Sequence, residues 1–396
     1  MQEIITRYTL KLIFIFWATI LFNNEIVAQN YEAGFSYKDS TGFIEYLAGN
    51  IPVIISAPHG GYALPDSIPD CPNCSSTRDA YTQEIAREIY TKFYSEIGCY
   101  PHVIINLLHR QKLDMNRNIA DATGGIPLLQ SAWDAYHYFI DISKLKADDN
   151  LDKGLFLDLH GHGHDIQRIE LGYLLSKSEL QMTDSEIDAI EFINESSIKA
   201  LTNDNLQKLS HAELLRGEFA FGTLMDNSGF PSVPSQSDPF PEMDEPYFSG
   251  GYNTEKHGSR GSGTIDAIQL EFNQSIRFDE GVRDILTDSL VSVVIDFIDL
   301  HYQSSFSSTG CDQVLNNSNN PSAEITVYPN PSSGQIKVTG LNEAAEIKIY
   351  NTMGYQVYTA QLNGDSFWVD DLINGNYLIT IRTKTQFESI KFSIIK

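Results

Sequence analysis

Four short apolar runs of this 396-residue chain each end in a side chain that can take part in chemistry. The runs are 52–57, 103–108, 155–159 and 267–270, and the side chains that follow them are His59, Arg110, His160 and Glu271. Imidazoles are common zinc ligands, a guanidinium can clamp an anion, and a carboxylate can act as a general base. The sequence therefore predicts a metal-dependent hydrolase site.

The runs are rich in Val, Ile and Leu and too short for helices, so each predicts a buried strand. Helical patterns over residues 79–97, 183–201 and 282–302 alternate with them. This order predicts an α/β domain with three α/β/α layers around a mixed central sheet. Ligands of such sheets bind beyond the carboxyl ends of the strands, where the four polar side chains lie. Residues 217–263 are rich in Gly, Pro and Ser and predict a long, functional loop.

A zinc hydrolase usually has three protein ligands and a water, so His59 and His160 need a third partner. Asp79, at the start of a predicted helix, and Glu84, farther in, are both candidates. An aspartate at a helix start can equally cap free N–H groups, so these residues alone leave the choice open.

Other polar residues of these segments predict supporting roles. Asp158 shares a strand face with His160, which is the usual place for a carboxylate that orients a ligand imidazole. His162 and His164 follow glycines and are interpreted as pocket-rim or solvent histidines.

The carboxylate of Glu271 lies on the inner part of a strand, where an unpaired buried charge is costly unless the group has a partner or a catalytic role. Deprotonating a water at the metal is such a role. Arg110 can steady an anion in the site. Alternatively, Arg110 and Arg117 form salt bridges with Asp114 and Asp121.

The amino-terminal residues predict export. Arg7 and Lys11 precede an apolar stretch, 12–22, and a small-residue site at Ala28, so residues 1–28 are expected to be a cleaved signal peptide. A membrane anchor is the alternative, but the stretch is short for a bilayer.

A net charge of -25 disfavours nucleic acid and anionic membranes as partners. In an exported chain, Cys71-Pro-Asn-Cys74 predicts a local loop disulfide or no bond.

Residues 304–322 are rich in Ser and Asn and predict a flexible linker, which leaves 29–303 as the catalytic domain. Short alternating strands in 323–396 predict a small all-β sandwich with no catalytic cluster. Its motifs resemble the C-terminal sorting domain of type IX secretion; they are Val327-Tyr328-Pro329-Asn330-Pro331 with Gly334, Ile349-Tyr350-Asn351 with Gly354, and Gly375-Asn376-Tyr377. The resemblance implies contact with that secretion machinery and a cell-surface or secreted location. A carbohydrate-binding or adhesion domain is the alternative.

Motifs across the catalytic domain resemble the N-formylglutamate amidohydrolase family, a branch of the carboxypeptidase-like zinc hydrolases. They are Ala57-Pro58-His59-Gly60-Gly61, Asp79 with Thr82 and Ile85-Ala86, Arg110-Gln-Lys-Leu-Asp114-Met-Asn116-Arg117, Asp158-Leu-His160, Gly250-Gly251-Tyr252 with His257-Gly258, and Gln269-Leu270-Glu271. The resemblance implies zinc held by His59, Asp79 and His160, with Glu271 as the catalytic carboxylate. It also implies that Asn116 and Arg117 bind the substrate's carboxylate, with His257 beside them.

The HxxE ligand pair of carboxypeptidases is absent, since Tyr62 stands three residues after His59. The family's role in histidine degradation is cytoplasmic, whereas this chain is predicted to be exported. We therefore expect an exported zinc amidohydrolase that cleaves an N-acyl amino acid or a glutamyl amide bond. The alternatives are a poly-γ-glutamate or cell-wall peptidase, and a non-catalytic surface binding protein on a hydrolase scaffold.

Overall fold

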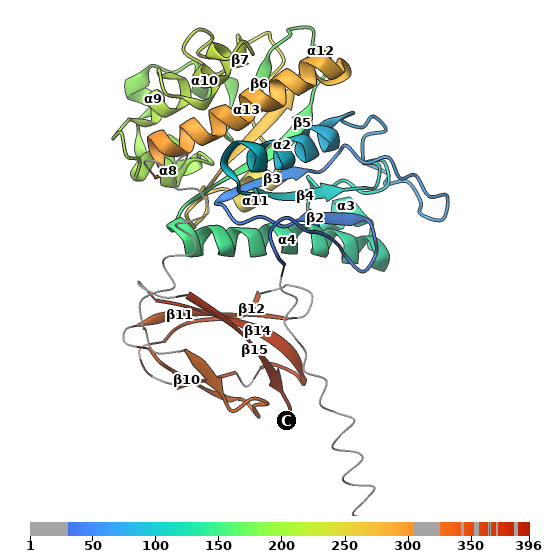
Figure 1. Cartoon of the computed structure of the whole chain (residues 1–396), viewed down its shortest axis with the longest axis vertical. Helices are drawn as coiled ribbons and strands as arrows, with labels where there is room; N and C mark the ends of the chain where they lie inside the picture. The colour runs from blue at the N-terminus through green and yellow to red at the C-terminus, as the bar shows by residue number, and fades with distance from the viewer. Residues whose placement is uncertain are drawn as a thin grey trace, which may run out of the picture. The chain divides into compact units, whose positions relative to one another are not determined.

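The computed structural model describes residues 31–303, 325–341, 344–351, 356–362, 364, 366–369, 371–383 and 387–396 (Figure 1). The predicted signal peptide and the predicted linker lie outside the described residues. In the part that is described, no helix combines the length and the apolar character needed to cross a membrane.

An eight-stranded mixed sheet forms the centre of residues 31–303, in the order β1-β2-β4-β3-β5-β8-β6-β7. The strands are β1 (Ser36–Lys38), β2 (Ile44–Leu47), β3 (Val53–Ala57), β4 (His102–Asn106), β5 (Gly154–Gly161), β6 (Ile169–Gly172), β7 (Ser232–Val233) and β8 (Ile265–Phe272). Strands β4, β3, β5 and β8 are mutually parallel, while β2 and β6 pair antiparallel on either side of them. All four predicted strands are therefore confirmed, and their carboxyl ends share one edge of the sheet.

Helices cover both faces of this sheet, which confirms the three layers (Figure 1). Helices α2 (Thr82–Ile97) and α13 (Glu280–His301) pack together on one face, and α4 (Pro127–Leu151) lies on the other face, where it contacts α11 (Tyr252–His257). Shorter helices fill the connections: α3 (Ile119–Thr123), α5 (Lys177–Leu180), α6 (Asp184–Ile187), α7 (Ile190–Glu195), α8 (Lys199–Asn203), α9 (His211–Arg216), α10 (Phe221–Asn227) and α12 (Gln274–Phe278).

The alternation of side chains along β5 explains why the polar groups gather on one face. Leu155 and Leu157 join the core beneath α2 and α13. Phe156 points the other way, with its ring 5.5 Å from that of His257 in α11. Side chains two residues apart share a face, so Asp158 and His160 also face away from α2 and α13. Because both faces are covered, the strands are continuous apolar runs, with polar side chains at their ends.

Two predictions about the connections were wrong. Residues 183–201 do not form one helix, because the chain breaks at Asp188 and Ala189 between α6 and α7 and again at Ser196 and Ser197 between α7 and α8. Ser197 donates its backbone N–H to the carbonyl of Tyr173 and its hydroxyl to the carbonyl of Ala267, so the sheet holds this point. Residues 217–263 are not simply a loop, since they contain α10, β7 and α11.

The described residues of the carboxyl-terminal part form two antiparallel sheets, β13-β10-β9 and β12-β11-β14-β15. The strands are β9 (Thr326–Tyr328), β10 (Gln335–Thr339), β11 (Ala345–Asn351), β12 (Gln356–Leu362), β13 (Ser366–Trp368), β14 (Gly375–Arg382) and β15 (Phe387–Ile394). Ile336, Ile347 and Ile379 are fully buried in a core that includes residues of both sheets. The all-β prediction is therefore confirmed. In the other part of the chain, Cys71 and Cys74 form a disulfide.

Gly60 and Gly61 allow the segment after β3 to lie against its neighbours. A Cβ atom on Gly60 would meet the hydroxyl of Thr82 at 2.6 Å, and one on Gly61 would lie 2.2 Å from the carbonyl oxygen of Leu108. These glycines thus allow the segment after β3 to pack closely against the segments of Thr82 and Leu108, and this packing fixes the position of His59.

We predict that Gly61→Ala lowers the free energy of unfolding by about 1–3 kcal/mol, because its methyl group meets backbone that cannot move aside. Gly261→Ala is the matched control, since a Cβ at Gly261 meets nothing within 4 Å. Denaturant unfolding of both variants measures the effect. Equal stability of the two variants would contradict this account of the His59 segment.

Candidate metal site

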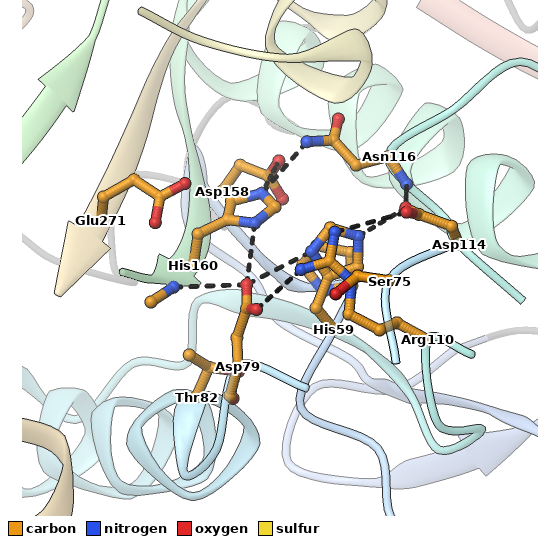
Figure 2. A network of polar contacts seen from close by, with 12 residues as sticks. His59, Ser75, Asp79, Thr82, Arg110, Asp114, Asn116, Asp158, His160 and Glu271 are labelled. Atoms are coloured by element: carbon orange, nitrogen blue, oxygen red, sulfur yellow. Dashed lines mark hydrogen bonds and ion pairs between the residues drawn. The ribbon is translucent and has the colours of Figure 1, made fainter. Parts of the chain in front are cut away.

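Two imidazole nitrogens point at the same carboxylate oxygen beyond the ends of β3 and β5. Nδ1 of His59 and Nδ1 of His160 each lie 3.2 Å from Oδ2 of Asp79 (Figure 2). The two rings meet edge to face with centroids 4.7 Å apart. One ligand atom from each residue lies within 4.8 Å of the others, which is a spacing that a single metal ion can bridge.

The opposite nitrogen of each ring is held by a second carboxylate. Nε2 of His59 lies 2.5 Å from Oδ1 of Asp114, and Nε2 of His160 lies 2.8 Å from Oδ2 of Asp158. Metal-binding histidines typically donate their far N–H to such a carboxylate, which fixes the tautomer and the ring orientation. With the proton on Nε2, both rings present Nδ1 as a ligand toward Asp79.

Arg110 joins the carboxylates of this cluster from one side. Its Nη1 donates to Oδ1 of Asp79 at 2.8 Å, and its Nη2 to Oδ2 of Asp114 at 3.3 Å. The salt bridge to Asp114 agrees with the alternative role that the sequence left open for Arg110, namely pairing with Asp114 and Asp121. Asp121, the other, instead accepts from the side-chain amide of Asn118.

The electrostatics of Asp79 keep it ionised. Burial by itself raises the pKa of this carboxyl, but the opposing effects of His59, His160 and Arg110 leave the pKa well below its usual value. An ionised oxygen beside two Nδ1 atoms is a donor set that can hold a dication such as zinc.

Glu271 lies beside this cluster on the neighbouring strand. It is the direct register partner of His160, and its side chain extends toward His160 in Figure 2. Burial raises the pKa of Glu271, and although His160 opposes the shift, the pKa reaches about 8. Gln269 donates to Oε1 of Glu271 at 3.0 Å. A carboxyl group that titrates near neutral pH can both accept and release a proton.

The donor set fits a metal cation on grounds of charge as well as geometry. Four buried carboxyl groups gather here, namely Asp79, Asp114, Asp158 and Glu271, and a pKa of about 8 leaves Glu271 largely protonated at neutral pH. Among the described residues, the guanidinium groups hydrogen-bonded to them are those of Arg110 and Arg117. Although burial lowers the pKa of His160, Asp158 and Asp79 raise it well above its usual value, so a proton on His160 supplies the remaining positive charge when no metal is bound. A bound dication would take the place of that proton.

The other predicted site residues divide into two groups. Asn116 and Arg117 lie at the cluster: Nδ2 of Asn116 is 3.4 Å from Nε2 of His160, and Nε of Arg117 is 3.2 Å from Oδ2 of Asp114. The Asn116 carbonyl accepts from the backbone of Asn253 at 2.7 Å. A Cβ on Gly251 would lie 2.3 Å from the Asn116 amide, so glycine is needed there.

Glu84 and His257 have other partners. Oε1 of Glu84 accepts from the Tyr62 hydroxyl, so the structure brings Asp79, and not Glu84, to the two histidines. His257 is fully buried, with Nε2 2.8 Å from Nδ1 of His137 and Nδ1 3.4 Å from Asp141. It supports the packing of α11 on α4, and the structure gives it no contact with the cluster.

Two buried side chains that the sequence analysis missed hold the loops of the site together. Arg277 donates to the carbonyls of Phe272, Ala80 and His162, which ties the end of β8 to the segments that carry Asp79 and His160. Asn106 donates to the carbonyls of Pro58 and Leu113, the residues before His59 and Asp114. Asn106 is the polar residue that interrupts the apolar run 103–108, and this signal could have marked it. Arg277 carries no comparable signal.

Comparisons with known proteins agree with the carboxyl-terminal prediction. Residues 326–396 match the family model described as the Secretion system C-terminal sorting domain. This match indicates export to the cell surface or beyond it by type IX secretion. A structure of PorZ, a surface component of the type IX secretion system of Porphyromonas gingivalis, is 19% identical over 24% of this chain and only 14% of its own, with a TM-score of 0.17.

Two solved structures resemble a larger part of the chain. N-formylglutamate amidohydrolase from Ralstonia eutropha is 12% identical over 64% of this chain and 96% of its own, with a TM-score of 0.37. The gene product Atu2144 from Agrobacterium tumefaciens is 11% identical over 66% of this chain and 96% of its own, with a TM-score of 0.40. No curated protein matches the chain. At these values a likeness says nothing about activity, which must be argued from the side chains of the site.

We predict that Asp114→Asn weakens metal binding by about 10–100-fold, because the amide no longer fixes the His59 ring through an ionised acceptor. Asp121→Asn is the matched control, since Asp121 is exposed and bonded to Asn118. Competition with a chromophoric chelator measures both affinities. Unchanged affinity in Asp114→Asn would show that His59 is not a ligand oriented in this way.

Proposed function

We propose that the domain before the linker is a zinc-dependent amidohydrolase that cleaves an amide bond with an activated water. The observation that supports this most strongly is the convergence of His59 Nδ1, His160 Nδ1 and Asp79 Oδ2 beside the carboxylate of Glu271. Two nitrogens and one carboxylate oxygen form a typical catalytic zinc set, which leaves the fourth position for water. When bound, zinc supplies Lewis acidity that lowers the pKa of water and polarises a carbonyl.

Glu271 is the general base of the proposed reaction. Its carboxylate takes a proton from the water that attacks the amide carbon, and it then passes that proton to the departing nitrogen. A pKa near 8 suits both steps, because the group gains and loses a proton at little cost near neutral pH. The amide C–N bond breaks as the nitrogen is protonated, and the products are a carboxylic acid and an amine.

Arg110 is placed to stabilise negative charge that develops on the amide oxygen. Its two terminal nitrogens are engaged by Asp79 and Asp114. Its Nε is buried and has no hydrogen-bond partner among the described residues, and we infer that this N–H donates to the oxyanion.

Arg117 and Asn116 give the site a preference for a substrate with a carboxylate. Arg117 uses Nε for Asp114, while 38% of its side chain is exposed, so its terminal N–H groups can bind a carboxylate. We infer an N-acyl amino acid, of which N-formylglutamate is one example, or a γ-glutamyl amide. Since the carboxyl-terminal sorting domain indicates export, such substrates would be met outside the cell.

We predict that Glu271→Gln lowers kcat by at least ~10²-fold while zinc stays bound, because the amide keeps the shape of the side chain but cannot accept a proton. Glu84→Gln is the matched control and retains both zinc and turnover. Hydrolysis of N-acyl glutamates and γ-glutamyl peptides, with zinc measured by elemental analysis, provides both readouts. Normal turnover by Glu271→Gln would remove it as the base, and a zinc-loaded wild type that cleaves neither substrate class would contradict the function.

A further inference from the structure

A second cluster of metal-binding side chains lies on the far side of Glu271. Nδ1 of His164 is 2.7 Å from Oε1 of Glu170, and Nδ1 of His162 is 3.9 Å from the same oxygen. One ligand atom from each of the three residues lies within 4.8 Å of the others. His162 is only 2% exposed, so its interpretation as a rim or solvent histidine was wrong.

The ring of His162 is oriented as a metal ligand would be. Its Nε2 lies 2.9 Å from the carbonyl oxygen of Arg168, which places the proton on Nε2 and leaves a lone pair on Nδ1, 3.9 Å from Oε1 of Glu170. In the protein as described, this lone pair also accepts the backbone N–H of His164 at 3.2 Å. A backbone carbonyl behind an imidazole is a common way to fix the tautomer of a metal-binding histidine.

Glu170 is a fully buried carboxylate with little positive charge around it. Among the described residues, its partners are the two imidazoles and the backbone N–H of Phe248, which donates to Oε2 at 2.8 Å. The nearby guanidinium of Arg168 is directed to Asp238 and Glu245 instead. A buried carboxylate of this kind is stabilised by a cation, and two imidazoles select one of the zinc class.

The two clusters flank a common carboxylate. Glu271 is the register partner of His160 on one side and of Glu170 on the other, so these three side chains leave neighbouring strands on one face. Adjacent strands lie about 4.8 Å apart, which places Glu271 between the two sets of ligands.

We propose that His162, His164 and Glu170 form a second site for a zinc-class dication, so that the protein holds one metal ion on each side of Glu271. The side chain of His164 is 20% exposed, which leaves that side of the site open to solvent or to an anionic group of a substrate. The proposal depends only on these three side chains, and it holds whether or not the first site is catalytic.

Metal stoichiometry of the full mature chain tests the proposal. Metal-free protein is titrated with Zn²⁺ by calorimetry and with Co²⁺ by visible absorption, which reports the ligand field of each equivalent. Wild type should bind two equivalents. His164→Ala and the isosteric Glu170→Gln should each bind one, and either variant suffices if the other does not fold. His109→Ala is the histidine control outside both clusters and should bind two.

His160→Ala separates this proposal from the first site, because it should lose the first equivalent and keep the second. If wild type binds one equivalent and His164→Ala also binds one, the second site does not exist. Two equivalents in both folded second-site variants would overturn it as well. One equivalent in wild type that His164→Ala removes and His160→Ala retains would support the second site and reject the first.

Discussion

A single carboxylate oxygen of Asp79, shared by two imidazoles, is the contact on which the rest of the site depends. His59 and His160 both face this oxygen, and Asp114 and Asp158 hold their far nitrogens. The cluster thereby gathers more negative charge than its guanidinium partners offset. A metal cation would offset this imbalance, and the same reasoning extends across Glu271 to Glu170, where a buried carboxylate again faces two imidazoles.

This concentration of charge requires stiff support from the backbone. Arg277 ties three segments at the edge of the sheet through their backbone carbonyls. It also packs directly against the chain beside His160, since a Cβ on Gly161 would lie 2.3 Å from Nε of Arg277. Asn106 does the same for the segments of His59 and Asp114. Such contacts position ligand atoms more closely than loops alone can do.

The sequence predicted the parts of the site that depend on local pattern. Strands covered on both faces are continuous apolar runs, so the polar residues at their ends, such as His59, His160 and Glu271, stood out. Contacts between distant segments left no such pattern: nothing near Arg277 signals that it reaches Ala80, nearly two hundred residues away along the chain. The break at Ser197 was missed for the same reason, because its partners are distant in the sequence: Ala267 lies in β8 and Tyr173 directly follows β6.

Anomalous diffraction at the zinc absorption edge, from crystals of the mature protein grown with Zn²⁺, tests the central claim most directly. We predict a peak about 2.0–2.2 Å from Nδ1 of His59, Nδ1 of His160 and a carboxylate oxygen of Asp79. Two results would contradict the account. One is an ion held by Glu84 in place of Asp79. The other is the absence of a peak at His59, His160 and Asp79 in crystals that bind zinc elsewhere.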